Sequence, residues 1–182
     1  MSTITAMNDI CIYHASEFAG EAIKDFLLKF CSGYKNVAFV FIGTDANVGD
    51  SLAPMAGSLI NRAGTGIFYY GDLTSPLTAK DVPYIADYVK NAHPQSKIVV
   101  IDAAVGKKED VGCIKILPRS IRPGLGVNKR LPPIGDVSVI GVISERSQSN
   151  LAMLGYAKVS NVYRMAKAIA DGINGFVSAF SA

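Results

Sequence analysis

NVAFVFIG, residues 36–43, is almost continuously apolar and runs directly into the turn-forming residues TDANVGD, residues 44–50. A short apolar run of this kind is typical of a central parallel strand that is buried on both faces. KIVVIDAAVG, residues 97–106, repeats the pattern, and we expect its strand to end at Asp102. The two segments predict the central strands of an α/β sheet.

Stretches with helical periodicity separate these and further apolar runs. Apolar residues recur at intervals of three and four over residues 17–31, 52–63 and 78–92, and residues 149–176 are largely helical in pattern. Strands are expected at residues 9–14, 66–71, 111–118 and 137–144. This alternation indicates a sheet with helices on both of its faces.

The composition fits one globular domain over residues 1–182 and gives little support to a nucleic-acid partner. Hydrophobic residues make up 49% of the 182 residues, and 18 Lys and Arg oppose 15 Asp and Glu without any basic run. No apolar stretch approaches the roughly 20 residues that span a bilayer, and the N-terminus lacks a signal-peptide pattern. The three cysteines are widely spaced, so we expect free thiols in a soluble, cytoplasmic protein without a membrane contact.

Acidic residues follow both predicted central strands. Asp45 and Asp50 come after the first strand and Asp102 after the second, and the carboxyl ends of parallel strands meet at one edge of a sheet. Two close carboxyl groups can share a proton and activate water, or they can hold a divalent metal. Asp50 can instead cap the helix that starts at Ser51, and Asp102 can be a buried hydrogen-bond acceptor.

A long irregular loop, RSIRPGLGVNKRLPPIGD at residues 119–136, is rich in Gly, Pro and basic residues. Folded over the strand ends, it can offer backbone N–H groups and positive charge to a carboxylate, a peptide carbonyl or a phosphate; alternatively it is a solvated turn. The turn after residue 43 has neither the lysine of a P-loop nor the glycine spacing of a dinucleotide site. His14 and His93 have no acidic neighbours in a metal-site pattern.

Three segments in order carry a resemblance to known families: VGDSLAP (48–54), IVVIDAAVG (98–106) and IRPGLGVNKRLPPIGDVSVIGVI (121–143). Together they resemble the bacterial spore germination proteases. Over nearly the full chain the sequence is more similar to the YyaC-type sporulation proteins and, more distantly, to hydrogenase maturation proteases. The resemblance implies a three-layer α/β/α sandwich of the phosphorylase/hydrolase-like type, with a mixed, mostly parallel sheet.

The resemblance also implies a function. Germination proteases are aspartate-dependent endopeptidases that degrade small acid-soluble spore proteins, and their catalytic acids fall at the positions of Asp50 and Asp102. We therefore expect a sporulation-associated peptidase in the spore-forming cell or the spore interior, with no metal and no cofactor. The residues expected to contact a peptide substrate are Asp45, Asn128, Lys129 and Arg130.

Departures from the pattern keep a second hypothesis open. The chain is considerably shorter than the germination proteases, its loop is one residue shorter before Asn128, and SERSQSN replaces the continuation of the last strand. No histidine follows residue 93, so nickel recognition is not expected. The alternative is a non-catalytic sporulation factor that binds a peptide or protein partner in the same crevice. The apolar C-terminal segment GINGFVSAF permits a homo-oligomer.

Overall fold

The computed structural model describes residues 10–123 and 131–180 of the chain. This part contains six strands and five α-helices, which alternate from β1 to β4, and one 3-10 turn between β4 and β5. In chain order the elements are β1 (Ile10–Tyr13), α1 (Ala19–Phe30), β2 (Asn36–Phe41), α2 (Leu52–Leu59), β3 (Ile67–Tyr70), α3 (Val82–Ala92), β4 (Ser96–Gly106), η1 (Lys108–Asp110), β5 (Cys113–Leu117), β6 (Val137–Glu145), α4 (Asn150–Gly155) and α5 (Val159–Phe180).

The strands form one mixed sheet in the order β1-β5-β6-β4-β2-β3. β4 pairs in parallel with β2 on one side and with β6 on the other, and β3 extends the parallel part beyond β2. At the opposite edge, β5 pairs with β6 in antiparallel orientation, and β1 pairs with β5 in antiparallel orientation. The mixed, mostly parallel sheet predicted from the sequence is confirmed.

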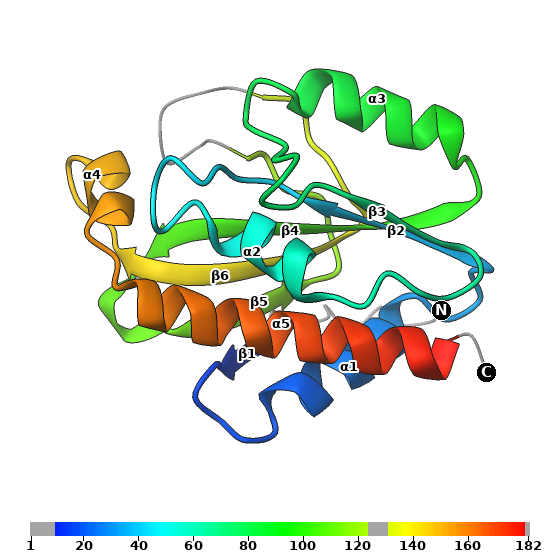
Figure 1. Cartoon of the computed structure of the whole chain (residues 1–182), viewed down its shortest axis with the longest axis horizontal. Coiled ribbons are helices and arrows are strands. Elements are labelled where there is room, and N and C mark those ends of the chain that lie inside the picture. Colours follow the sequence, from blue (N-terminus) through cyan, green and yellow to red (C-terminus); the bar gives the residue numbers. More distant parts are fainter. Residues whose placement is uncertain (1–9, 124–130, 181–182) are drawn as a thin grey trace, which may run out of the picture.

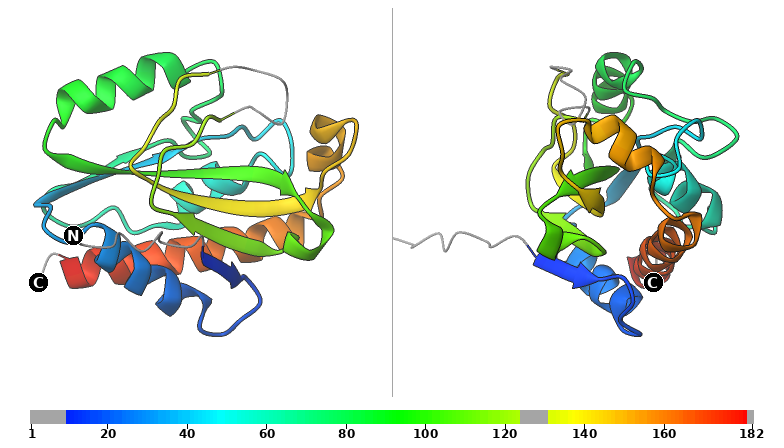
Figure 2. Two further views of the ribbon diagram at one scale, coloured as in Figure 1. Left: turned by 180° about the vertical axis from the view of Figure 1, so that it is seen from behind. Right: turned by 90° about the vertical axis from the view of Figure 1, so that its left-hand side faces the viewer.

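Helices cover both faces of this sheet and complete a three-layer sandwich (Figure 1). α1, α2 and α5 pack on one face around a core that includes Phe39 and Phe176, whereas α3 packs on the other around Val40 and Val100. Figure 2 shows the same separation in the end-on view. Successive residues of β2 enter opposite cores, which explains its continuous apolar sequence. None of the helices within residues 10–123 and 131–180 combines the length and apolarity needed to cross a membrane.

The boundary expected for the second central strand is wrong. β4 does not end at Asp102 but continues to Gly106, because its pairing with β6 continues as far as Gly106 opposite Glu145. Its pairing with β2 ends earlier, at Phe41 opposite Ile101. The last part of β4 therefore has a neighbouring strand on one side only.

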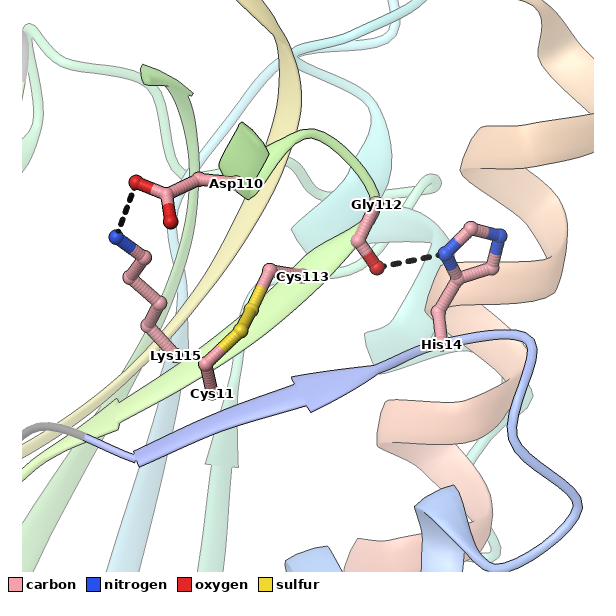
Figure 3. The surroundings of a disulfide bond; sticks show 6 residues. All are labelled: Cys11, His14, Asp110, Gly112, Cys113 and Lys115. Atoms are coloured by element: carbon pink, nitrogen blue, oxygen red, sulfur yellow. Dashed lines mark hydrogen bonds and ion pairs between the residues drawn. A yellow bond between two sulfur atoms is a disulfide. The ribbon is translucent and has the colours of Figure 1, made fainter. Parts of the chain in front are cut away.

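The expectation of free thiols is also wrong for two of the three cysteines. Cys11 of β1 and Cys113 of β5 form a disulfide, with their Cα atoms 5.7 Å apart, while Cys31 is free and buried (Figure 3). The two cysteines are separated by 102 positions in the sequence, so only the antiparallel pairing of β1 with β5 brings them together. His14 fixes the same corner through a 2.7 Å contact between its Nδ1 and the carbonyl oxygen of Gly112.

Candidate functional site

The loop between β2 and α2 places Asp50 beside the end of the sheet. After β2 the chain turns away from β4: the Gly43 N–H donates to the carbonyl of Leu77 at 2.8 Å, and the Thr44 N–H donates to the carbonyl of Asp50 at 3.2 Å. A Cβ atom on Gly43 would lie only 2.1 Å from the carbonyl oxygen of Asp50. Glycine at this position therefore allows the loop to close on itself and fixes the backbone that carries Asp50.

The Asp50 side chain does not cap the helix that follows it. Ser51, not Asp50, is the residue that precedes the first turn of α2, and no side chain makes a capping hydrogen bond there. The Ser51 hydroxyl instead donates to the carbonyl of Val48 at 2.7 Å. The capping interpretation of Asp50 is thus wrong, and its half-buried carboxyl group is not committed to the helix start.

Asp102 reaches the same region from β4. It pairs with Ile140 of β6, and alternation along the strand places its side chain on the face that also carries Val100, the face covered by α3. One carboxyl oxygen of Asp102 accepts a 2.9 Å hydrogen bond from the N–H of Ala103. The backbone thus holds this carboxyl group close to the strand from which it projects.

Asp50 and Asp102 line one cavity of about 1430 Å³ at the carboxyl ends of β2 and β4. Asp45 lies on the same loop as Asp50, but its side chain is exposed and is not among the described residues that line the cavity. Asn128, Lys129 and Arg130, the other expected substrate contacts, lie outside the described residues. The structure therefore brings together the two acids expected to form the pair.

The surroundings of both acids favour their neutral forms. Burial is the main cause that raises the pKa of the Asp102 carboxyl to about 8; the hydrogen bond from Ala103 opposes the rise, and the charge of nearby Asp50 adds to it. Burial also raises the pKa of Asp50. Because Asp50 acts on the pKa of Asp102, the two groups titrate as a coupled pair. At neutral pH the pair therefore retains a proton on Asp102.

Basic side chains line the cavity around this acidic pair. Four of the described lining residues are cationic and two are acidic; the cationic ones are Lys80, Arg119, Arg122 and Arg146. Arg119 and Arg122 lie on either side of Ile121. The Ile121 N–H donates to the carbonyl of Ile134 at 3.1 Å, and the Ile134 N–H donates back to the carbonyl of Ile121 at 2.9 Å, which fixes this part of the loop. The cavity thus combines a proton-bearing acidic pair with a positively charged border.

Sequence reasoning did not single out the residues that line the cavity from beyond β6. Arg146 follows β6 directly, and its N–H donates to the carbonyl of Gly106 at 2.8 Å. Asn150 begins α4, which lies where β4 and β6 finish (Figure 1). Both residues come after the carboxyl end of a parallel strand, the same signal that identified Asp50. The position of SERSQSN directly after a predicted strand could therefore have identified Arg146 and Asn150 as candidate site residues.

The described residues contain no group of three or more His, Cys, Asp or Glu side chains that could hold a metal ion. His93 lies away from the cavity, stacks on Phe68 with ring centroids 3.6 Å apart, and hydrogen bonds to the Tyr70 hydroxyl. His14 contacts the backbone near the disulfide. Both histidines therefore lie apart from the acidic pair.

The chain matches the model of a family described as "Protein of unknown function (DUF1256)" over residues 11–172. It is also similar to the "Uncharacterized protein YyaC" of Bacillus subtilis (strain 168), with 28% identity over 167 residues. That similarity covers 90% of this chain and 81% of the Bacillus protein. The matched range contains both acids and all the described residues that line the cavity.

Proposed function

The chain belongs to the DUF1256 family of proteins of unknown function, and we propose that it is an aspartate-dependent peptidase whose catalytic groups are Asp50 and Asp102. One observation supports this proposal above the others. Two carboxyl groups line the same cavity, and one of them, Asp102, retains its proton near neutral pH. An acid and a base are thereby available together, which hydrolysis without a nucleophilic side chain requires.

We assign the role of the acid to Asp102, whose pKa of about 8 keeps a proton on it at neutral pH, and the role of the base to Asp50. Asp50 takes a proton from a water molecule while the water oxygen attacks the carbonyl carbon of the peptide. Asp102, as the neutral member, donates its proton to the carbonyl oxygen, which gives a tetrahedral diol. Collapse of the diol breaks the C–N bond, and the proton now held by Asp50 goes to the leaving amine. The products are a carboxylic acid and an amine, and Asp102 regains its proton from the diol.

The resemblance to the spore germination proteases supports small acid-soluble spore proteins as the first substrates to test. The cationic border of the cavity also suits proteins that carry exposed carboxylates. A role in sporulation, in the spore-forming cell or the spore interior, rests on the same resemblance. The expected substrate contacts Asn128, Lys129 and Arg130 belong to this proposal.

The test is to incubate the purified chain with small acid-soluble spore proteins, with and without a chelator, and to identify the fragments by mass spectrometry. We expect cleavage that is insensitive to the chelator. Asp50→Asn or Asp102→Asn should each lower the rate by roughly 10²- to 10⁴-fold, the usual contribution of a positioned acid or base. Asp87→Asn, which changes an exposed carboxylate on α3, is the matched control and should retain the full rate.

Two outcomes would count against this proposal. Full activity in either cavity variant would show that the acidic pair does not carry the reaction. Binding of a spore protein without any cleavage would instead favour the alternative, a non-catalytic factor that uses the same cavity to hold a peptide or protein partner. The large cavity volume supports this alternative as well, because about 1430 Å³ exceeds what two carboxyl groups and a water molecule need.

A further inference from the structure

The end of β4 presents an open backbone edge inside the cavity. The last hydrogen bond from the β2 chain to β4 is donated by the Ile42 N–H to the carbonyl of Ile101, at 2.9 Å. The following N–H groups of that chain bond elsewhere, Gly43 to Leu77 and Thr44 to Asp50. β4 nevertheless runs on to Gly106. Within the described residues, therefore, no residue of β2 pairs with β4 beyond Ile101.

Strand alternation shows which backbone groups this edge offers. Since the carbonyl of Ile101 faces β2, the C=O of Ala103 and the N–H of Val105 face the same side. The irregularity between β4 and β6 does not change this, because the register shift places the extra residue, Ile143, on β6. The N–H of Ala103 on this edge bonds to the carboxyl group of Asp102, which shows how close the edge lies to the acidic pair.

The cavity is shaped and charged for an occupant along this edge. Ala103, Ala104 and Val105 all line it, and the two alanines project little side chain into the space. Lys80 and Arg146 lie on the cavity lining together with two arginines of the long loop, so cations outnumber acids among the described lining residues. An extended chain with carboxylate side chains matches both the free backbone groups and the charge.

We propose that the cavity binds an extended, acidic peptide by strand addition, in which one peptide residue donates its N–H to the carbonyl of Ala103 and accepts from the N–H of Val105. This inference rests on the proposed action of the cavity on peptides and specifies how the peptide is recognised. Backbone hydrogen bonds along a sheet edge supply sequence-independent affinity, and flanking pockets or charges supply selectivity. The added strand places its own peptide bonds beside Asp50 and Asp102.

The binding test uses the full chain with Asp50→Asn and Asp102→Asn together, so that binding is measured without cleavage, and Asp50→Asn alone as a second protein. The probe is a fluorescein-labelled peptide of about twelve residues with glutamates at both ends and Ala, Ser and Val between them. Saturating peptide should slow amide hydrogen exchange at Val105 by about tenfold or more. N-methylation of the one peptide N–H that reaches Ala103 should weaken binding about tenfold, the effect of one lost hydrogen bond, while methylation of its immediate neighbours has little effect.

Charge is tested separately. Arg146→Gln should weaken binding of this probe and reduce its dependence on salt, whereas Lys90→Gln, an exposed change on α3, should do neither. No measurable binding of the acidic peptide, equal binding of a peptide with lysine ends, tighter binding of an oligothymidylate, or unchanged exchange at Val105 in the saturated complex would each overturn strand addition.

The two proposals can fail independently. Protection of Val105 without cleavage by the wild-type chain would support strand addition and remove the peptidase. Cleavage without protection of Val105 would support the peptidase and remove strand addition.

Discussion

Replacing Asp102 with asparagine should stabilise the protein at alkaline pH and leave it nearly unchanged at acidic pH. The carboxyl group has a pKa of about 8 in the folded protein against the ordinary value of 3.8, chiefly because it is buried. Between these two values the unfolded chain has lost the proton that the folded protein still holds. The free energy of unfolding therefore falls as pH rises through this range, by up to about 1.4 kcal/mol per pH unit.

The size of the effect comes from the difference between the two pKa values. A difference of about 4 pH units sets an upper limit on the order of 5 kcal/mol, lost between about pH 4 and pH 8 and constant above that. Asp102 is half-buried and lines the cavity, so its carboxylate is partly solvated and the loss is smaller than this limit. Asparagine has the shape of the neutral acid and keeps the acceptor for the Ala103 N–H. It removes only the cost of ionising a buried group.

The measurement is urea unfolding of the wild-type chain and the Asp102→Asn variant at about pH 3.5, 6 and 9, which lie below, within and above the range between the two pKa values. The two midpoints should nearly coincide at the lowest pH, and the variant midpoint should be clearly higher at the highest. Asp87→Asn, an exposed substitution on α3, controls for the removal of one negative charge and should follow the wild type. If the midpoints of wild type and Asp102→Asn change in parallel with pH, Asp102 does not hold its proton in the folded state.

Activity, loop packing and the disulfide each give a further prediction. The rate of peptide cleavage should decline as pH rises through about 8, where Asp102 loses the proton that it donates, and a rate that keeps rising at alkaline pH would contradict this role. Gly43→Ala should cost about 1 to 3 kcal/mol in urea unfolding and reduce activity, because its Cβ would lie 2.1 Å from the carbonyl oxygen of Asp50, whereas Gly155→Ala, with nothing nearer than 3.6 Å, should be mild. Cys11→Ser should lower the free energy of unfolding of the oxidised protein by about 5 kcal/mol, because the disulfide closes a loop across 102 positions. A reducing agent should have the same effect on the wild type and none on the variant.

The sequence predicts the centre of the sheet well because burial on both faces leaves little choice of residue. NVAFVF and the apolar run before Asp102 are the two parallel neighbours β2 and β4, and the helices between them follow from their apolar periodicity. The end of β4 could not be predicted in the same way. Ala103, Ala104 and Gly106 have no strong strand preference, and only the continued pairing with β6 keeps them extended.

The candidate site divides along similar lines. That Asp50 and Asp102 would meet follows from a rule of topology, which needs only the positions of the strand ends. The pKa of Asp102, the use of Ser51 rather than Asp50 at the helix start, and the disulfide depend on distances between segments remote in sequence. Residue spacing carries no information about such distances, so these features appear only in the folded structure.

One structural event accounts for both proposals: β2 stops at Phe41 while β4 continues beside β6. Because β2 ends early, a cavity opens beside the last part of β4, and Asp102 lines it. The backbone edge of Ala103 and Val105 faces the same space. Acid–base chemistry and strand recognition are therefore geometrically linked, because a peptide on that edge lies beside the acidic pair. A relative that binds without cleaving needs only the open edge, whereas a peptidase also needs the proton on Asp102. Comparing cleavage by the wild-type chain with protection of the Val105 amide therefore distinguishes the two.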